Sequence, residues 1–96
     1  MELELKNENG NLLVKVIGRL DTITSQKLEE ALSNNIDGVN VVTFDFEKLN
    51  YISSSGIRIL LTTRKKIENM KVLNPTKEVM EVFEITGLSE IFNIQK

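Results

Sequence analysis

The stretch FDFEKLNYISSSGIRILLTTRKKI, Phe44 to Ile67, decides the fold. An apolar run from Val39 to Phe46, rich in valine, threonine and phenylalanine, has the composition of a central β-strand. A short polar link, in which Leu49 is the apolar position expected to be buried, leads from this strand toward three serines and a glycine. The residues after the glycine then follow a helical rather than a strand pattern.

That helical pattern begins directly after Gly56. At about 100° per residue, the apolar residues fall on one stripe, with Ile59 at its edge: Ile57, Leu60, Leu61 and Ile67. The opposite face is polar and carries Arg58, Thr62, Lys65 and Lys66. Ser53, Ser54 and Ser55 therefore lie where a strand has ended and a helix begins.

The residues before this stretch predict a hairpin and a helix. Leu3 and Leu5 alternate with charged residues, as in a half-buried strand, and Asn9-Gly10 is a strong hairpin signal. A denser apolar run, Leu12 to Ile17, returns as a more interior strand. We expect Thr24 to be the N-cap of the next helix, which carries an apolar face of Leu28, Ala31 and Leu32.

The residues after this stretch predict a further strand and helix. Met70 to Leu73 form the strand, which follows the preceding helix without a glycine, so either that helix unwinds early or the strand is short. Thr76, or Asn74 with Pro75 in the first turn, caps the last helix, and Gly87 ends it. Ile91, Phe92 and Ile94 form a last short strand or turn.

This order of elements predicts an α/β fold. We expect one domain over residues 1–96, with a mixed four- to five-stranded β-sheet and helices packed on one side, starting near Thr24, Ser54 and Thr76. At 96 residues, a single domain can bury a working core without disulfides.

The composition excludes several classes of function. The chain has no histidine and no cysteine, so it cannot build an imidazole metal site or a Ser-His or Cys-His nucleophile pair. A net charge of −2 and the absence of tryptophan give no reason to expect nucleic acid as a partner. No apolar run approaches the roughly 18 residues of a membrane span, and no signal peptide is visible. We expect a cytoplasmic protein that is not an enzyme and needs no cofactor or metal.

Three motifs resemble the STAS domain, the fold of bacterial anti-sigma factor antagonists. They are the Gly-x-Leu-Asp step at Gly18–Asp21, the serine motif before the second helix, and the run EVFEITGLSEIF at Glu81–Phe92. The family motif reads Asp-Ser-Ser/Thr-Gly, and its phosphorylated residue is the first hydroxyl after the aspartate. Here Ser53 stands in place of the aspartate, Ser54 is at the phosphoacceptor position, Ser55 is the second hydroxyl and Gly56 is the glycine.

The resemblance implies a binding module that serves as a kinase substrate. Its partner would be an anti-sigma factor with a kinase-type ATP-binding fold, which holds a sigma factor until the antagonist binds. Phosphorylation of Ser54, with Ser53 and Ser55 as alternatives, would end the contact, and a phosphatase would reset it. The expected partner-binding residues are Asp21, Thr22, Ser53, Ser54, Ser55, Gly56, Arg58 and Thr62.

The residues themselves leave alternatives open. Serines at a helix start can be structural, because their hydroxyls accept hydrogen bonds from free backbone N–H groups. The same geometry suits a phosphate, which would face the positive end of the helix and lie four residues from Arg58. Asp21 is either a turn residue or part of the docking surface. The serine in place of the aspartate also permits a STAS adaptor that is never phosphorylated, such as a subunit of a lipid-transport ATPase.

Overall fold

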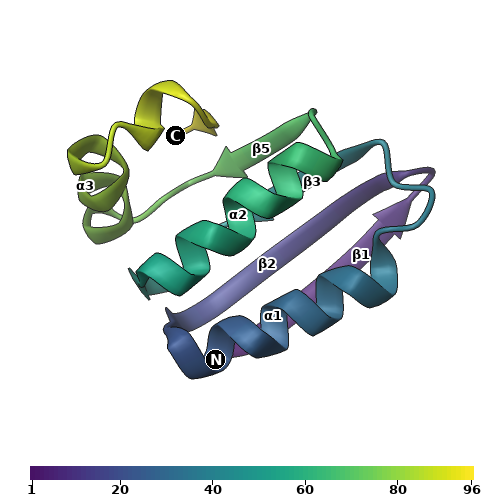
Figure 1. The fold of residues 1–96 in the computed structure, drawn as a ribbon, viewed down its shortest axis with the longest axis horizontal. Helices are drawn as coiled ribbons and strands as arrows, with labels where there is room; N and C mark the ends of the chain where they lie inside the picture. Colours follow the sequence, from purple (N-terminus) through teal and green to yellow (C-terminus); the bar gives the residue numbers. More distant parts are fainter.

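The computed structural model describes all residues from 1 to 96 and contains a mixed sheet with three helices (Figure 1). Along the chain the elements are β1 (Glu2–Glu8), β2 (Asn11–Leu20), α1 (Thr22–Asn35), β3 (Val41–Asp45), β4 (Leu49–Ile52), α2 (Ser54–Lys66), β5 (Met70–Leu73), α3 (Lys77–Ile85), a 3₁₀ turn (Leu88–Glu90) and β6 (Asn93–Gln95). The predicted α/β class and the order of the helices are confirmed.

The sheet has six strands rather than the predicted four to five. Five follow the order β1-β2-β3-β5-β6, in which only the β1–β2 hairpin is antiparallel. The sixth, β4, was interpreted from the sequence as a link. It forms because β2 is ten residues long but pairs with β3 only as far as Lys15, which leaves its last residues free for β4. The register shifts between Gly18 and Arg19, where the pairing with β4 begins.

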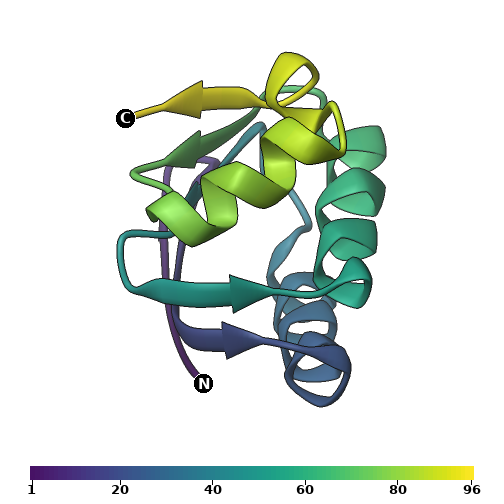
Figure 2. The same cartoon turned by 90° about the vertical axis from the view of Figure 1, so that its left-hand side faces the viewer.

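Two helices cover one face of the sheet, while the third lies at its end. α1 and α2 run side by side over that face (Figure 1), and α3 packs against β4 beside the ends of the strands (Figure 2). The Thr76 hydroxyl fastens α3 there, because it donates to the Leu49 carbonyl oxygen at 2.7 Å and also accepts from Val79 N at 3.4 Å. Thr76 is therefore the N-cap, as one of the two alternatives predicted, and the left-handed Gly87 (φ 79°) follows the C-cap.

Twenty buried apolar residues form one continuous core between the helices and the sheet. Leu49 is fully buried in it, as predicted, and the rings of Phe83 and Phe92 meet edge to face with centroids 5.5 Å apart. The stripe of α2 is turned slightly from the predicted one. Ile59 is buried together with Gly56, Leu60 and Thr63, whereas Ile57 and Leu61 are only half-buried at the margin of this stripe. The cause is that α2 packs against α1 as well as the sheet, which draws the flank carrying Ile59 inward.

The connection from α2 to β5 keeps the helix intact. α2 continues through Lys66 and the chain turns within residues 67–69, so the helix does not unwind early. The strand is the shortened element, because β5 has only four residues. β3 is also shorter than the predicted Val39 to Phe46, because Val39 and Asn40 turn back to hydrogen-bond with Ile36 and Gly10.

Candidate functional site

The starts of α1 and α2 lie next to each other at one end of the sheet, at the left in Figure 1. β2 and β4 are parallel neighbours, and each runs directly into a helix. A hydrogen bond of 2.8 Å from Ser53 N to the Leu20 carbonyl oxygen ties the two strand ends together. Residues separated by some thirty positions along the chain, around Asp21 and around Ser54, are brought to one surface in this way.

The three serines have different environments. Ser53 is the N-cap of α2, and its hydroxyl oxygen accepts a hydrogen bond from Gly56 N at 3.3 Å. Ser55 is half-buried in the first turn. Ser54 is exposed, and its hydroxyl makes no hydrogen bond within the chain. Of the three hydroxyls, that of Ser54 is the one both exposed to solvent and not engaged in capping the helix.

Gly56 lets the first turn of α2 approach the sheet closely. A β-carbon built at this buried position would lie 2.8 Å from Leu20 Cδ2 and 3.0 Å from Ile52 Cγ1. Both neighbours are themselves buried and come from the ends of β2 and β4. We call residues 53–56, which carry the three serines and Gly56, the serine turn. The absence of a side chain at Gly56 therefore determines how closely the serine turn lies against the sheet.

The start of α1 differs from the predicted one. Asp21, not Thr24, is the N-cap: its carboxylate accepts hydrogen bonds from Thr24 N at 2.9 Å and Ile23 N at 3.1 Å. Thr24 is the third helical residue and closes a capping box, in which its hydroxyl accepts from Asp21 N at 2.8 Å. Aspartate is a strong N-cap because it brings a negative charge to the positive helix end. Hydrogen bonds from Thr24, first from its backbone and then from its hydroxyl, lower the pKa of Asp21.

We expect the stability of the protein to depend on pH through Asp21. Because folding lowers its pKa, its stabilising effect is complete above the unfolded value of about 4 and is lost as the pH falls through the folded value. Asp21→Asn retains a good capping residue but loses the charge. It should therefore be less stable than the wild type at pH 7, with a difference that shrinks below about pH 4 in urea unfolding. Asp37→Asn, at an exposed turn, is the control, and equal pH profiles for all three chains would contradict this role of Asp21.

A polar hollow of about 230 Å³ lies between the first turns of the two helices. Three predicted site residues line it, Thr22 from α1 and Ser55 and Arg58 from α2. Thr62 lines an adjoining hollow of about 150 Å³ further along the same two helices. Asp21, Ser53 and Ser54 line neither hollow. The predicted residues therefore share one surface, but they do not all face one cavity.

Three exposed side chains beside this surface were not predicted from the sequence as site residues, those of Ile23, Arg19 and Tyr51. Ile23 is 79% exposed in the first turn of α1. Arg19 stacks over the ring of Tyr51, with its guanidinium carbon 4.3 Å from the centroid. Ile23 could have been found, because it lies roughly opposite the apolar stripe of its helix. The Arg19–Tyr51 pair could not, because it depends on the register between β2 and β4.

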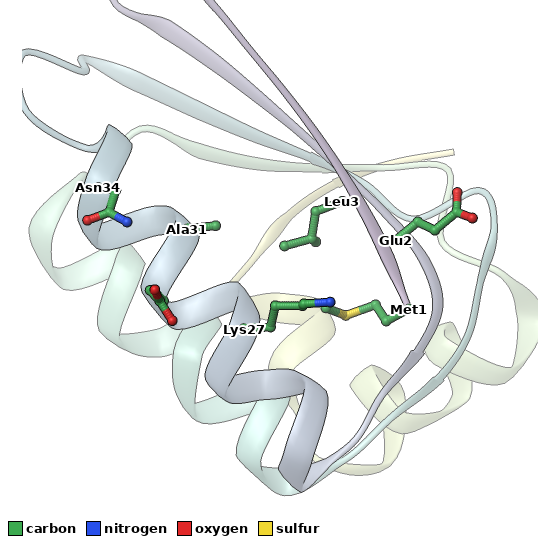
Figure 3. A pocket seen from close by; sticks show the side chains of 7 residues that line it. Met1, Glu2, Leu3, Lys27, Ala31 and Asn34 are labelled. Carbon is green, nitrogen blue, oxygen red and sulfur yellow. The ribbon is translucent and has the colours of Figure 1, made fainter.

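The largest hollow of the molecule lies elsewhere. It measures about 620 Å³ and opens between the start of β1 and the outer side of α1, where Leu3 and Ala31 face each other (Figure 3). No three histidine, cysteine, aspartate or glutamate side chains gather anywhere in the chain in a way that could hold a metal ion. None of the helices combines the length and the apolar character needed to cross a membrane.

Comparison with known proteins extends over the whole chain. The chain is 33% identical over 99 residues to BtrV of Bordetella bronchiseptica, and the aligned region covers 98% of this chain and 85% of BtrV. It is 27% identical over 101 residues to the anti-sigma-B factor antagonist of Staphylococcus aureus, covering 100% of this chain and 94% of that protein.

Solved structures show the same fold. SpoIIAA in its unphosphorylated form superposes with a TM-score of 0.84 at 22% identity, over 99% of this chain and 89% of SpoIIAA. The phosphorylated form of SpoIIAA from Bacillus superposes with a TM-score of 0.76 at 22% identity, over 99% of this chain and 92% of SpoIIAA. The model of the STAS domain matches residues 2–96. With the six-stranded sheet and the serine-bearing helix start at its end, this match shows that the chain belongs to the STAS domain family.

Proposed function

We propose that the chain is an anti-sigma factor antagonist, which binds an anti-sigma factor and so releases a sigma factor. The observation that carries this proposal is similarity over the full length to a protein named for that function in Staphylococcus aureus. The surface around the starts of α1 and α2 supports it, because side chains suited to recognition are exposed there without partners in the chain. In this function the protein acts by binding and is not an enzyme.

The same surface supports a switch by phosphorylation of Ser54. Its hydroxyl is exposed and free, whereas Ser53 caps the helix and Ser55 is half-buried. A phosphoserine carries about −1.5 to −2 charges, and at the first residue of α2 these would lie at the positive end of the helix. The fold would therefore tolerate the phosphate, while a partner surface that fits the neutral serine would not.

The partner in this proposal is an anti-sigma factor with a kinase-type ATP-binding fold. ATP and Mg²⁺ would be held by that partner, which would transfer the phosphoryl group to Ser54 and so end its own inhibition by the antagonist. A phosphatase would be needed to restore the binding form. The chain itself contributes the acceptor hydroxyl and the docking surface around it.

A second function is favoured by one departure from the family motif. Position 53 holds a serine where the family motif Asp-Ser-Ser/Thr-Gly has an aspartate, and the Ser53 hydroxyl accepts the capping hydrogen bond from Gly56 N. The carboxylate of that motif, next to the phosphoacceptor position, is therefore missing. A constitutive adaptor, docked through the same surface as a subunit of a larger complex such as a lipid-transport ATPase, would not need that carboxylate.

We expect the double variant Arg58→Ala/Thr62→Ala to fold normally but bind poorly. Both side chains are exposed, and exposed substitutions usually change stability by no more than about 0.5 kcal/mol. Binding to the purified cognate anti-sigma factor, measured by calorimetry, should weaken at least about tenfold, because both residues lie on the proposed docking surface. Arg64→Ala, an exposed arginine of the same helix on another flank, should bind like the wild type. Equal affinity of the folded double variant would place the site elsewhere.

A further inference from the structure

The exposed side of α2 has an unbalanced charge. Its sequence, SSGIRILLTTRKK, contains four basic residues and no acidic one. At about 100° per residue, the exposed cations Arg58, Lys65 and Lys66 fall on the same side of the helix as Thr62 and Ser54. We call the side chains of Arg58, Thr62, Lys65 and Lys66 the cationic face. Its basic side chains span about 12 Å along the helix axis.

The cations of this face have no partner within the chain. The one ion pair of the structure joins Lys6 and Glu8 at 2.9 Å, on β1. Glu29 of α1 lines both hollows between α1 and α2, together with Arg58 in one and Lys66 in the other, but it pairs with neither. The chain as a whole carries a net charge of −2, so the positive excess is a local property of α2.

Helix stability explains only part of this pattern. Lys65 and Lys66 lie in the last turn, where cations interact favourably with the negative end of the helix dipole. Arg58 is the fifth residue of α2, beyond the first turn and far from the last one, so the helix dipole does not favour a cation there. Helix stability therefore supplies no reason for a cation at Arg58.

The two hollows between α1 and α2 offer a partner protein a place to bind beside the cationic face. They share Glu29 and Ile59, so together they form one groove along α1 and α2. The end near the serines is lined mostly by polar side chains, while the other end adds Leu32 and Ile36. A groove with apolar floor residues, flanked by Arg58 and Lys66 on α2 and by Glu29 on α1, fits protein side chains better than the regularly spaced phosphates of a nucleic acid.

We propose that the cationic face binds an acidic surface, rich in aspartate and glutamate, on the partner protein. This inference rests on the proposed function, in which that partner is the anti-sigma factor. It also gives the switch a physical cause. A phosphate on Ser54 would add its negative charge to the side of α2 that attracts the acidic surface, so it would cancel part of the attraction and repel the partner's carboxylates.

The first test compares two charge-reversed variants with the same change in net charge. Lys65→Glu/Lys66→Glu reverses the cationic face, and Lys48→Glu/Lys77→Glu reverses two exposed lysines elsewhere. Affinity for the purified anti-sigma factor at about 50 mM NaCl should fall about thirty-fold for the first variant and less than about threefold for the second. The difference should shrink at about 500 mM NaCl, because salt screens exposed charges. Equal affinities for the two folded variants would overturn the proposal.

The second test does not require that the partner be known in advance. A chain with p-benzoylphenylalanine in place of Thr62 is photo-crosslinked in lysate of the source cells, and the attached segment is sequenced. An attached protein segment rich in aspartate and glutamate supports the proposal, whichever protein it comes from. A segment without acidic residues, an attached nucleic acid or lipid, or no specific product overturns it. A wild-type chain that fails to bind any kinase-type anti-sigma factor contradicts the proposed function, while this crosslink still decides the chemistry of the face.

Discussion

Gly56→Val is expected to destabilise the protein by about 3 kcal/mol, the largest effect on stability that we predict for one residue of the serine turn. A native domain of this size is stable by only about 5 to 15 kcal/mol, so the change is a large fraction of the total. The cause is steric. The new β-carbon would lie 2.8 Å from Leu20 Cδ2 and 2.9 Å from Leu20 Cγ, before the two methyl groups of valine are added.

Leu20 cannot easily move aside. It is fully buried, as are most of its neighbours, so relief of the contact requires the first turn of α2 to shift away from β2 and β4. Intrinsic helix propensity works in the other direction, because valine is a better helix former than glycine. A loss of stability in Gly56→Val would therefore reflect the steric contact with Leu20 and not the helix propensity of valine. The same shift would displace Ser53, Ser54 and Ser55, so binding should suffer as well.

Urea unfolding measures this prediction. The midpoint for Gly56→Val should fall at an unchanged slope, which indicates a change of stability rather than of compactness. Ser54→Val is the matched control, since it places the same side chain in the same turn at an exposed position and should cost no more than about 0.5 kcal/mol. A Gly56→Val chain as stable as this control would show that the turn does not depend on close approach.

The fold was predictable from the sequence wherever a local sequence pattern agreed with the surroundings of the same residues in the folded structure. Asn9 and Gly10 form the hairpin turn that their dipeptide predicts, both with positive φ, and Leu49 is buried as expected. The strand β4 was missed because its partner is the free end of β2, and four residues of mixed polarity carry no periodic signal of their own. The centre of the α2 stripe was misplaced for a related reason. A helical wheel gives the angles between residues but not which neighbour the helix packs against.

The candidate site was predictable to a similar degree. Helix-terminus chemistry predicted that a serine hydroxyl could accept from a free backbone N–H group, and the Ser53 hydroxyl accepts from Gly56 N. Thr24 was predicted as the N-cap of α1, yet Asp21 holds that position. Both residues are good caps, and the difference was decided by where β2 ends, at Leu20. The stacking of Arg19 on Tyr51 depends on strand register, which a single sequence does not reveal.

The second large effect concerns the switch. Ser54→Asp is expected to weaken binding to the anti-sigma factor at least about a hundredfold, because a like charge placed in an interface costs several kcal/mol. The variant should fold at least as well as the wild type, since an acidic residue at the first position of α2 interacts favourably with the helix dipole. Ser54→Asn has nearly the same shape without the charge. It should bind within a few-fold of the wild type, so the comparison isolates the charge.

Phosphorylation itself separates the two proposed functions. Incubation with the cognate kinase and ATP, followed by peptide mass mapping, should place the phosphate on Ser54, and Ser54→Ala should abolish it. Ser53 is the weaker substrate because its hydroxyl already accepts from Gly56 N, and a phosphate there would disturb the cap of α2. Ser55 is half-buried at the groove between the helices, where a kinase has less access. Phosphate on Ser53 or Ser55 would refute the assignment of the residue while leaving a switch. If no candidate kinase phosphorylates the chain and Ser54→Asp binds as tightly as Ser54→Asn, the surface docks without being modified, which is the behaviour of a constitutive adaptor.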